Sequence, residues 1–420
     1  MNADILILGA GIAGLRCGIE LLDKRPSQRV VILEKYNYIG GRVVTYRKSI
    51  EDIQGKCQKI QWENGAGRIH KSHTKLLELL KRYRLSTIPI DDQIYYEEKG
   101  VLTKNIFNET IALLSTAIEE LPLDYLATHT LREVLETILG EEKANALLIQ
   151  FPYRAEVDTL RADLGLESFR GEMGTYSEYM VVKEGFGALS KAMAKEFEHL
   201  GGTILKGQEV VDIQKSGSLI LVKTKTDAGS VVWEAPTVIC ALHRDALAEI
   251  PLFRDWKPLS YLKMEPLVRT YAMFPTKQGE SWFSDLPKVA SAERLRFFIP
   301  MNPSCGTVML SYTDGSDARK VIEMLDHYGE EKTGDILVED AKKAFPTKEI
   351  PDPLFFKSFP WTSGCTYWLP GSYDPENVSK QALKPFSDMN VYCCGESFSL
   401  RQAWVEGALE HADLLLTTHF

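Results

Sequence analysis

A buried apolar strand that leads directly into three spaced glycines is the feature that most constrains the fold. Residues 5–8 are aliphatic, and Gly9, Gly11 and Gly14 follow with the spacing G-x-G-x-x-G. The first glycine permits a tight turn, the second lets the backbone approach a pyrophosphate, and the third lets the next helix pack on the strand. An amphipathic stretch from Leu15 to Leu22 predicts that helix, whose N-terminus would face phosphate charge. The pattern therefore predicts a dinucleotide-binding turn.

A second apolar strand ends at an acidic residue in the position expected for ribose recognition. Residues 29–33 read as this strand, and Glu34 lies twenty residues beyond Gly14. A carboxylate there can accept hydrogen bonds from a pair of ribose hydroxyls. Strand, glycines, helix, strand and acid together predict a Rossmann-type α/β domain.

Composition sets the broad class of the protein. The 420 residues are 44% hydrophobic and 25% charged, which suffices for two substantial cores and gives no sign of disorder. The formal net charge of −9 argues against nucleic acid or an anionic membrane as a partner. The seven cysteines are scattered apart from Cys393 and Cys394, so we expect neither a disulfide framework nor a metal site.

The two ends of the sequence indicate where in the cell the protein is expected. The first strand begins four residues after Met1, which leaves no room for a targeting segment. The last helix runs to Phe420 without an apolar run of membrane length. We therefore expect a soluble, cytoplasmic protein without a membrane partner, and the sequence leaves homo-oligomerisation open.

Two further segments narrow the identity of the dinucleotide. A Gly-Gly-Arg sequence at residues 40–42 follows Glu34 and places an arginine where it can reach a phosphate or a flavin edge. Near the other end, residues 391–397 read as a strand and a turn, and residues 404–412 open a last helix. The three motifs resemble those of the flavin amine oxidase family, which includes monoamine oxidases and L-amino acid oxidases and binds FAD. A nicotinamide enzyme would explain the first motif alone.

The resemblance implies an interleaved fold. The expected class is α/β, with a Rossmann-type, GR2-like FAD-binding domain and an α+β substrate domain that bears a mixed sheet and a helical insert. The FAD-binding domain is expected over 1–88, 184–250 and 386–420, and the substrate-binding domain over 89–183 and 251–385.

The spacing of apolar residues predicts further strands and helices in both domains. Residues 94–102 alternate in polarity around a turn at Gly100, which predicts a hairpin. Residues 108–150 read as helical, with a capping box at Thr130 and Glu133. Cofactor-side strands are expected at 203–205, 209–213 and 237–242.

We expect these motifs, together with the turn at residues 65–68, to build the cofactor site. The resemblance implies that Glu396 meets the ribityl phosphate region, that the last helix points at the flavin ring, and that Val210 touches adenine through its backbone. The expected cofactor-binding residues are Gly9, Gly11, Ile12, Ala13, Gly14, Glu34, Lys35, Gly41, Arg42, Gly65, Ala66, Gly67, Arg68, Val210, Trp361, Gly395, Glu396, Trp404, Val405 and Ala408.

The same resemblance raises the question of a covalent flavin. Cys365 lies near the place where monoamine oxidases attach the flavin through a glycine-glycine-cysteine turn. Only Gly364 of that glycine pair is present here, and the downstream spacing differs. Because a free buried cysteine is the commoner state, we expect non-covalent FAD, with a link through Cys365 as the alternative.

A glycine-x-x-arginine turn from Gly65 to Arg68 bears on the substrate. In L-amino acid oxidases the corresponding turn supplies the guanidinium that binds the substrate α-carboxylate, so Arg68 is the candidate for this role. A planar guanidinium suits a carboxylate because two parallel, charge-assisted hydrogen bonds fix its orientation. The alternatives are pairing of Arg68 with a flavin phosphate or with Glu63. Trp404 is a second candidate, since a tryptophan precedes the same helix in amino acid oxidases; the alternative is a packed interface residue.

Aromatic residues crowd the segment 361–368, from which family members build the flavin-facing cage. Two flat side chains can hold a neutral amine and exclude water, so Tyr367 and Trp368 are candidate walls. The alternative is that either belongs to the core.

Arg269 stands where most oxidases of the family carry a lysine that holds a water near flavin N5. Arginine does not deprotonate in proteins, so a base role at this position is lost. Arg269 could still orient a water or hold a carboxylate, or it could be an ion-paired strand arginine. The substitution leaves open a slow oxidase or a dehydrogenase.

The resemblance implies an FAD-dependent amine oxidoreductase. Its reaction would be oxidative deamination, with hydride transfer to flavin N5, imine hydrolysis and, if O2 is the acceptor, hydrogen peroxide as a product. Arg68 favours L-α-amino acids as substrates over simple amines. The alternatives are a monoamine or polyamine oxidase and, from another class, an FAD-dependent desaturase or isomerase, or a non-catalytic flavoprotein.

Overall fold

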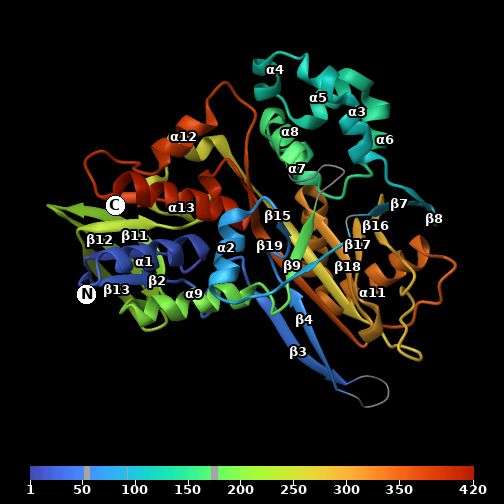
Figure 1. Ribbon diagram of the computed structural model, residues 1–420, viewed down its shortest axis with the longest axis horizontal. Coiled ribbons are helices and arrows are strands. Elements are labelled where there is room, and N and C mark those ends of the chain that lie inside the picture. The colour runs from blue at the N-terminus through green and yellow to red at the C-terminus, as the bar shows by residue number, and fades with distance from the viewer. Residues whose placement is uncertain (52–56, 92, 172–177) are drawn as a thin grey trace.

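A five-stranded parallel sheet forms the centre of one half of the molecule, in a computed structural model that describes residues 1–51, 57–91, 93–171 and 178–420 (Figure 1). All of its neighbouring pairs are parallel, and the side chains of its two N-terminal strands are buried, as in a sheet covered on both faces. The sheet confirms the expected Rossmann-type domain. Its order is β10 (Thr203–Leu205), β2 (Val30–Leu33), β1 (Ile5–Leu8), β14 (Thr237–Cys240) and β20 (Val391–Cys393).

Alternation along β1 explains how both faces of this sheet are covered. Ile5 and Ile7 pack with the helices on one face, whereas Leu6 and Leu8 pack with an antiparallel meander on the other. The helices are α1 (Ile12–Lys24), α9 (Gly187–His199) and α13 (Val405–His419), and the meander is β11 (Glu209–Ser216), β12 (Leu219–Thr226) and β13 (Gly229–Ala235).

A seven-stranded mixed sheet forms the centre of the other half (Figure 1). Only β16 and β7 pair in parallel among its neighbours, so the expected mixed sheet is confirmed. The long helix α11 (Gly315–Ala344), kinked at Gly329, packs on it. The strand order is β19 (Phe355–Trp368), β15 (Leu262–Met273), β18 (Thr307–Asp314), β17 (Phe297–Asn302), β16 (Lys288–Ser291), β7 (Ile94–Glu98) and β8 (Val101–Lys104).

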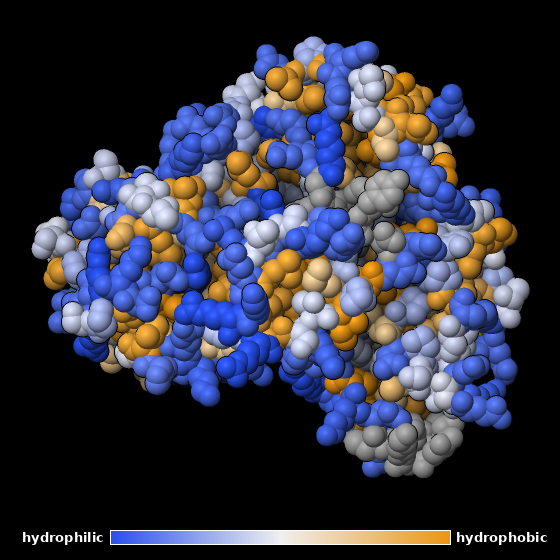
Figure 2. Space-filling model, viewed as in Figure 1, coloured by the Kyte–Doolittle hydropathy of each residue, from blue (hydrophilic) through white to orange (hydrophobic). Residues whose placement is uncertain are grey.

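The helical insert is also confirmed, with its own hydrophobic core. Thr130 accepts a hydrogen bond from the Glu133 N–H, the Glu133 carboxylate accepts one from the Thr130 N–H at 2.7 Å, and Gly140 ends the helix. Figure 2 shows hydrophobic side chains among hydrophilic ones over this part of the surface. The helices are α3 (Phe107–Glu119), α4 (Leu123–Thr128), α5 (Leu131–Leu139), α6 (Glu141–Leu148), α7 (Arg154–Asp158) and α8 (Ala162–Gly171).

One hairpin joins the two halves in a way that the sequence did not indicate. Strands β3 (Thr45–Glu51) and β4 (Cys57–Glu63) lie within the expected cofactor segment 1–88 but pack on the seven-stranded sheet, where the Trp62 ring stacks on Tyr271 at 4.9 Å. The domain boundaries themselves stay a prediction.

The remaining elements are short. They are β5 (Ile69–His70), β6 (Thr87–Pro89) and β9 (Tyr179–Val182), which form one sheet, with α2 (Thr74–Arg82), α10 (Arg244–Glu249) and α12 (Pro375–Ala382). None of the helices in the described ranges combines the length and the apolar character that crossing a membrane requires.

Candidate active site

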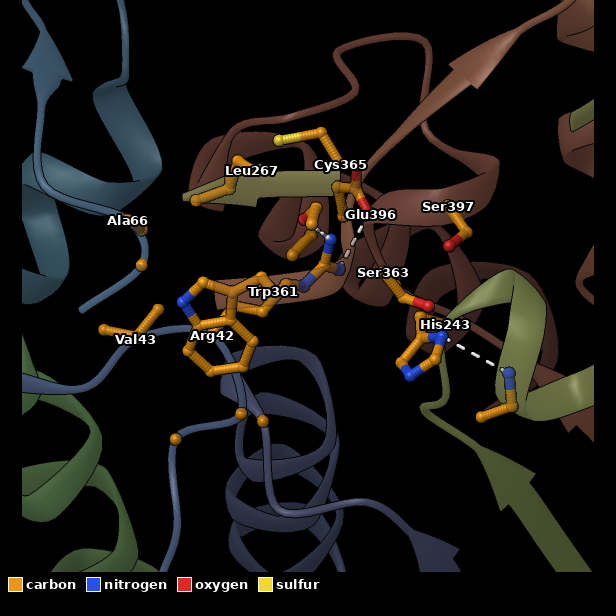
Figure 3. Close-up of a pocket in the computed structure, with 18 of the residues that line it drawn as sticks. Arg42, Val43, Ala66, His243, Leu267, Trp361, Ser363, Cys365, Glu396 and Ser397 are labelled. Atoms are coloured by element: carbon orange, nitrogen blue, oxygen red, sulfur yellow. Dashed lines mark hydrogen bonds and ion pairs between the residues drawn. The ribbon is translucent and has the colours of Figure 1, made fainter. Parts of the chain in front are cut away.

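A cavity of about 750 Å³ runs from the carboxyl ends of β1 and β2 to the face of the seven-stranded sheet. It is lined by segments far apart in the sequence, including the glycine turn, residues 40–43, residues 64–68 and the start of α13. Figure 3 shows side chains that line it, among them Arg42, Trp361 and Glu396, which come from three distant segments. Ligand sites in α/β proteins lie at this edge of the sheet.

The glycine turn leaves space for a phosphate at the N-terminus of α1. Gly11 is the N-cap, no side chain caps this helix, and a Cβ built on Gly11 would meet no atom within 4 Å. Gly41 faces it with a φ of +57°, and a Cβ on Gly41 would lie 3.6 Å from the Gly11 Cα. Gly14 has a different role: a Cβ there would lie 2.1 Å from the Gly9 carbonyl oxygen, so this glycine allows close helix–strand packing. The open space at the start of an uncapped helix fits a pyrophosphate.

Glu34 is held rigidly at the end of β2. Its Oε2 accepts the Ala10 N–H at 2.8 Å and its Oε1 accepts the Tyr36 N–H at 2.9 Å. Burial raises the pKa of Glu34, although these N–H groups oppose the shift. The fixed carboxylate on the cavity wall suits a ribose hydroxyl pair. Beyond it, Lys35 pairs with Glu209 at 2.7 Å, and Val210 lines the same end.

Arg42 and Glu396 meet at the middle of the cavity (Figure 3). Arg42 Nη2 donates to Glu396 Oε2 at 2.8 Å, and Arg42 Nη1 donates to the Gly364 carbonyl at 2.7 Å. Glu396 Oε1 accepts the Ala403 N–H at 2.8 Å. Burial alone would raise the pKa of Glu396, but Arg42 and the N–H donors hold it below its usual value.

Arg68 lies in an aromatic cage. Its guanidinium carbon is 4.6 Å from the ring centre of Tyr153, 4.9 Å from that of Tyr179 and 5.7 Å from that of Trp404. It forms neither a hydrogen bond nor an ion pair with any residue that the structure describes, and the alternative of a pair with Glu63 is not seen. Glu63 instead accepts from Thr45 at 2.8 Å and from the Phe186 N–H at 2.8 Å.

Arg269 presents a second guanidinium to the cavity. It lies on β15 opposite Tyr312 and Phe359, and a Cβ on Gly67 would come within 2.7 Å of its Nη1. Nη1 donates to the Tyr271 hydroxyl at 3.4 Å, whereas the buried Nε has no hydrogen-bond partner among the residues that the structure describes. In the described part of the chain, Arg269 is not the ion-paired strand arginine considered above.

The two candidate walls Tyr367 and Trp368 are not equivalent. Tyr367 lines the cavity, and burial raises its pKa well above the usual value. Trp368 lies outside it, fully buried, and donates from Nε1 to the Ser399 carbonyl at 3.0 Å. Successive strand residues point to opposite faces, so the interpretation of Trp368 as a wall is corrected to a core residue.

Trp361 and Cys365 of this segment also line the cavity (Figure 3). Trp361 donates from Nε1 to the Asn64 carbonyl at 2.7 Å, which fixes its ring. Burial raises the pKa of the Cys365 thiol to about 12, so the thiol form predominates.

The structure adds cavity residues that no sequence motif singles out. Tyr153 and Glu156 come from α7 and its N-cap, and Tyr312 and Asp314 come from β18. Burial raises the pKa of Asp314 to about 7. These residues meet only through tertiary packing, so the sequence offered no signal for them. Over the described ranges, no group of three or more His, Cys, Asp or Glu side chains could hold a metal ion.

Comparisons with known proteins agree with this arrangement. The profile of the family described as flavin containing amine oxidoreductase matches residues 12–414. Aplysianin-A of Aplysia kurodai is 21% identical over 99% of this chain and 90% of that protein. An L-amino-acid oxidase of Siganus canaliculatus is 23% identical over 97% of this chain and 83% of that protein. The structure of a putrescine oxidase mutant, from a redesign of its cofactor binding, is similar with a TM-score of 0.72 at 17% identity, covering 99% of both chains.

The match of the family profile extends over nearly the whole chain, and the glycine turn, the fixed Glu34 and the Arg42–Glu396 pair fit the flavin dinucleotide that such a family uses. The chain therefore belongs to the flavin-containing amine oxidoreductase family and is an oxidoreductase that acts on amines with a flavin cofactor.

Proposed function

We propose that this chain oxidises L-α-amino acids with non-covalently bound FAD. The single observation that carries the proposal is Arg68, a cavity-facing guanidinium for which the described residues supply no ion pair. A cation held away from bulk water is costly unless a counter-ion is present, so a ligand is its natural partner. The relative from Siganus canaliculatus is an L-amino-acid oxidase, which supports a carboxylate as that ligand.

The proposal that the cofactor is FAD rests on residues at the adenosine end and at the flavin end of the cavity. Glu34 and Val210 would hold the adenosine part, and the glycines at the start of α1 would receive the pyrophosphate. Trp361 and the uncapped N-terminus of α13 would border the flavin ring. The neutral thiol of Cys365 is a weak nucleophile, which supports non-covalent binding over a covalent link.

Bound flavin would supply the two-electron oxidation, and the chain's own residues would bind and orient the substrate. Arg68 would fix the α-carboxylate by two parallel hydrogen bonds, so that the Cα–H bond points in one direction. Tyr153 and Trp404 would exclude water around it. Arg269 would keep a permanent positive charge near the reacting atoms, and we propose O2 as the electron acceptor.

The test is anaerobic reduction of the holoenzyme, followed by its visible absorbance, with L-amino acids and with their decarboxylated amines. Amino acids should bleach the flavin faster, and Arg68→Ala should abolish that advantage with little effect on the amines. Equal rates for both classes in the unmodified protein would contradict the proposal. Acid precipitation should leave the flavin in the supernatant, and a yellow pellet would instead indicate a link through Cys365.

A further inference from the structure

Two carboxyl groups line the same cavity as Arg68 and come from facing elements. Glu156 lies one turn after Tyr153, whose ring carries the Arg68 guanidinium. Asp314 lies two residues after Tyr312 on the same face of β18, and the Tyr153 and Tyr312 rings meet edge to face at 5.4 Å. The two tyrosines and the two acids therefore lie on the wall of the cavity that also holds Arg68.

Asp314 is a buried carboxyl group on the wall of the cavity. It is 4% exposed and, among described residues, forms no ion pair; it accepts the Ala155 N–H at 3.1 Å and the Tyr312 hydroxyl at 3.4 Å. The nearby Arg296 pairs with Asp317 at 3.5 Å and donates from Nη1 to the Ile149 and Ser291 carbonyls. Burial raises the pKa of Asp314 to about 7, although the Ala155 and Arg154 N–H groups and the charge of Arg296 oppose the shift.

The hydrogen bond from the Ala155 N–H engages one oxygen of the Asp314 carboxyl group. It occupies Oδ1 at the start of a short helix, whereas the Tyr312 hydroxyl approaches Oδ2 at the longer distance of 3.4 Å. Glu156, 9% exposed, adds a second carboxyl group to this wall of the cavity. Arg68 thus offers the cavity a positive charge, and Asp314 offers a carboxyl group that a bound cation would ionise, so a ligand with both charges matches the two residues.

From these contacts we infer that the preferred substrates are L-α-amino acids whose side chain ends in a cation, with the α-carboxylate at Arg68 and the side-chain cation at Asp314 and Glu156. The inference rests on the proposed function, because Arg68 must bind the carboxylate. A simple diamine would leave Arg68 without an anion, and an apolar amino acid would leave Asp314 without a cation. Only a substrate with both groups neutralises both residues.

Four substrates test the two charged groups one at a time. Lysine has both groups, norleucine lacks the side-chain ammonium, cadaverine lacks the carboxylate, and pentylamine lacks both. The measurement is the second-order rate constant of anaerobic flavin reduction in the holoenzyme. Lysine should exceed norleucine and cadaverine each by at least about tenfold, the value of one charged hydrogen bond. Norleucine equal to lysine, with both above the amines, would overturn the inference and leave the proposed function standing. Cadaverine equal to or above lysine would overturn both.

Substitutions of Asp314 and Glu156 test whether these two acids cause the preference for lysine over norleucine. Asp314→Asn, which keeps an acceptor for the Ala155 N–H, should lower the lysine to norleucine ratio of rate constants about tenfold. Glu156→Gln is the second variant and should lower the same ratio. Asp340→Asn is the matched control, because Asp340 pairs with Arg294 at 2.6 Å and does not line the cavity. An unchanged ratio in both cavity variants, with flavin content retained, would overturn the inference.

Discussion

Arg42 and Glu396 lie 354 positions apart in the chain, yet Arg42 Nη2 donates to Glu396 Oε2 at 2.8 Å inside the cavity. The Glu396 side chain is 5% exposed and that of Arg42 is 27% exposed. The pair connects the Gly-Gly-Arg segment to the closing motif, so the two ends of the chain define one site.

Breaking this pair should weaken the fold and the retention of flavin together. Glu396→Gln leaves Arg42 without its counter-ion and should cost about 3 kcal/mol of unfolding free energy, measured by urea titration. The flavin to protein absorbance ratio after gel filtration should fall in parallel. Glu109→Gln is the control, because its partner Lys104 is 70% exposed and surface pairs contribute little. A normal flavin ratio in Glu396→Gln would remove the pair from the cofactor site.

Two glycines of the same motif should respond differently to alanine. A Cβ at Gly11 meets no protein atom within 4 Å and projects into the space assigned to the pyrophosphate. Gly11→Ala should therefore melt like the unmodified apoprotein but bind FAD at least about tenfold more weakly, as measured by flavin titration. A Cβ at Gly14 would lie 2.1 Å from the Gly9 carbonyl oxygen, so Gly14→Ala should lower the melting temperature of the apoprotein. Unchanged FAD affinity in Gly11→Ala would contradict the assignment.

The residues proposed to bind the cofactor could be identified from the sequence because binding a dinucleotide requires short local motifs. Gly11, Glu34 and Arg42 lie in short motifs in which each residue type follows from backbone geometry or charge. The structure places these residues along one cavity. Trp368 shows where prediction from local sequence fails. Successive residues of a strand point to opposite faces, so only one of Tyr367 and Trp368 can face the cavity.

The substrate half was less predictable because it is built by packing between distant segments. Tyr153, Glu156 and Asp314 belong to α7, its N-cap and β18, which carry no motif and meet only when the helical insert folds over the sheet. Arg68 became a candidate because its glycine-x-x-arginine turn resembles that of L-amino acid oxidases, and its role stays a prediction. Its aromatic cage is a property of the assembled fold and could not be read from the sequence.

Arg269 should set how the oxygen reaction depends on pH. The pKa of an arginine lies above the accessible range, so the rate of oxygen consumption by the reduced holoenzyme should be constant between about pH 6 and pH 10 with respect to this group. Arg269→Lys should introduce a fall in that rate as pH rises, because burial lowers the pKa of a lysine. Arg269→Met should be slow at every pH. Stopped-flow reoxidation measures the rate in the unmodified protein and in both variants. A rate in Arg269→Met equal to that of the unmodified protein would exclude a role for the charge.

Acid should destabilise the fold through His411, which is 2% exposed on α13 and bonds from Nε2 to the Ser379 carbonyl. Burial lowers its pKa from 6.5 to about 4. The folded state therefore favours the neutral ring, so its stability contribution is complete above pH 6.5 and is lost as pH falls toward 4. His411→Leu should reduce the loss of unfolding free energy between about pH 7.5 and 4.5 by about 2 kcal/mol, measured by urea titration. His327→Leu, at an exposed position, should leave that loss unchanged. An undiminished loss in His411→Leu would show that other groups control acid unfolding.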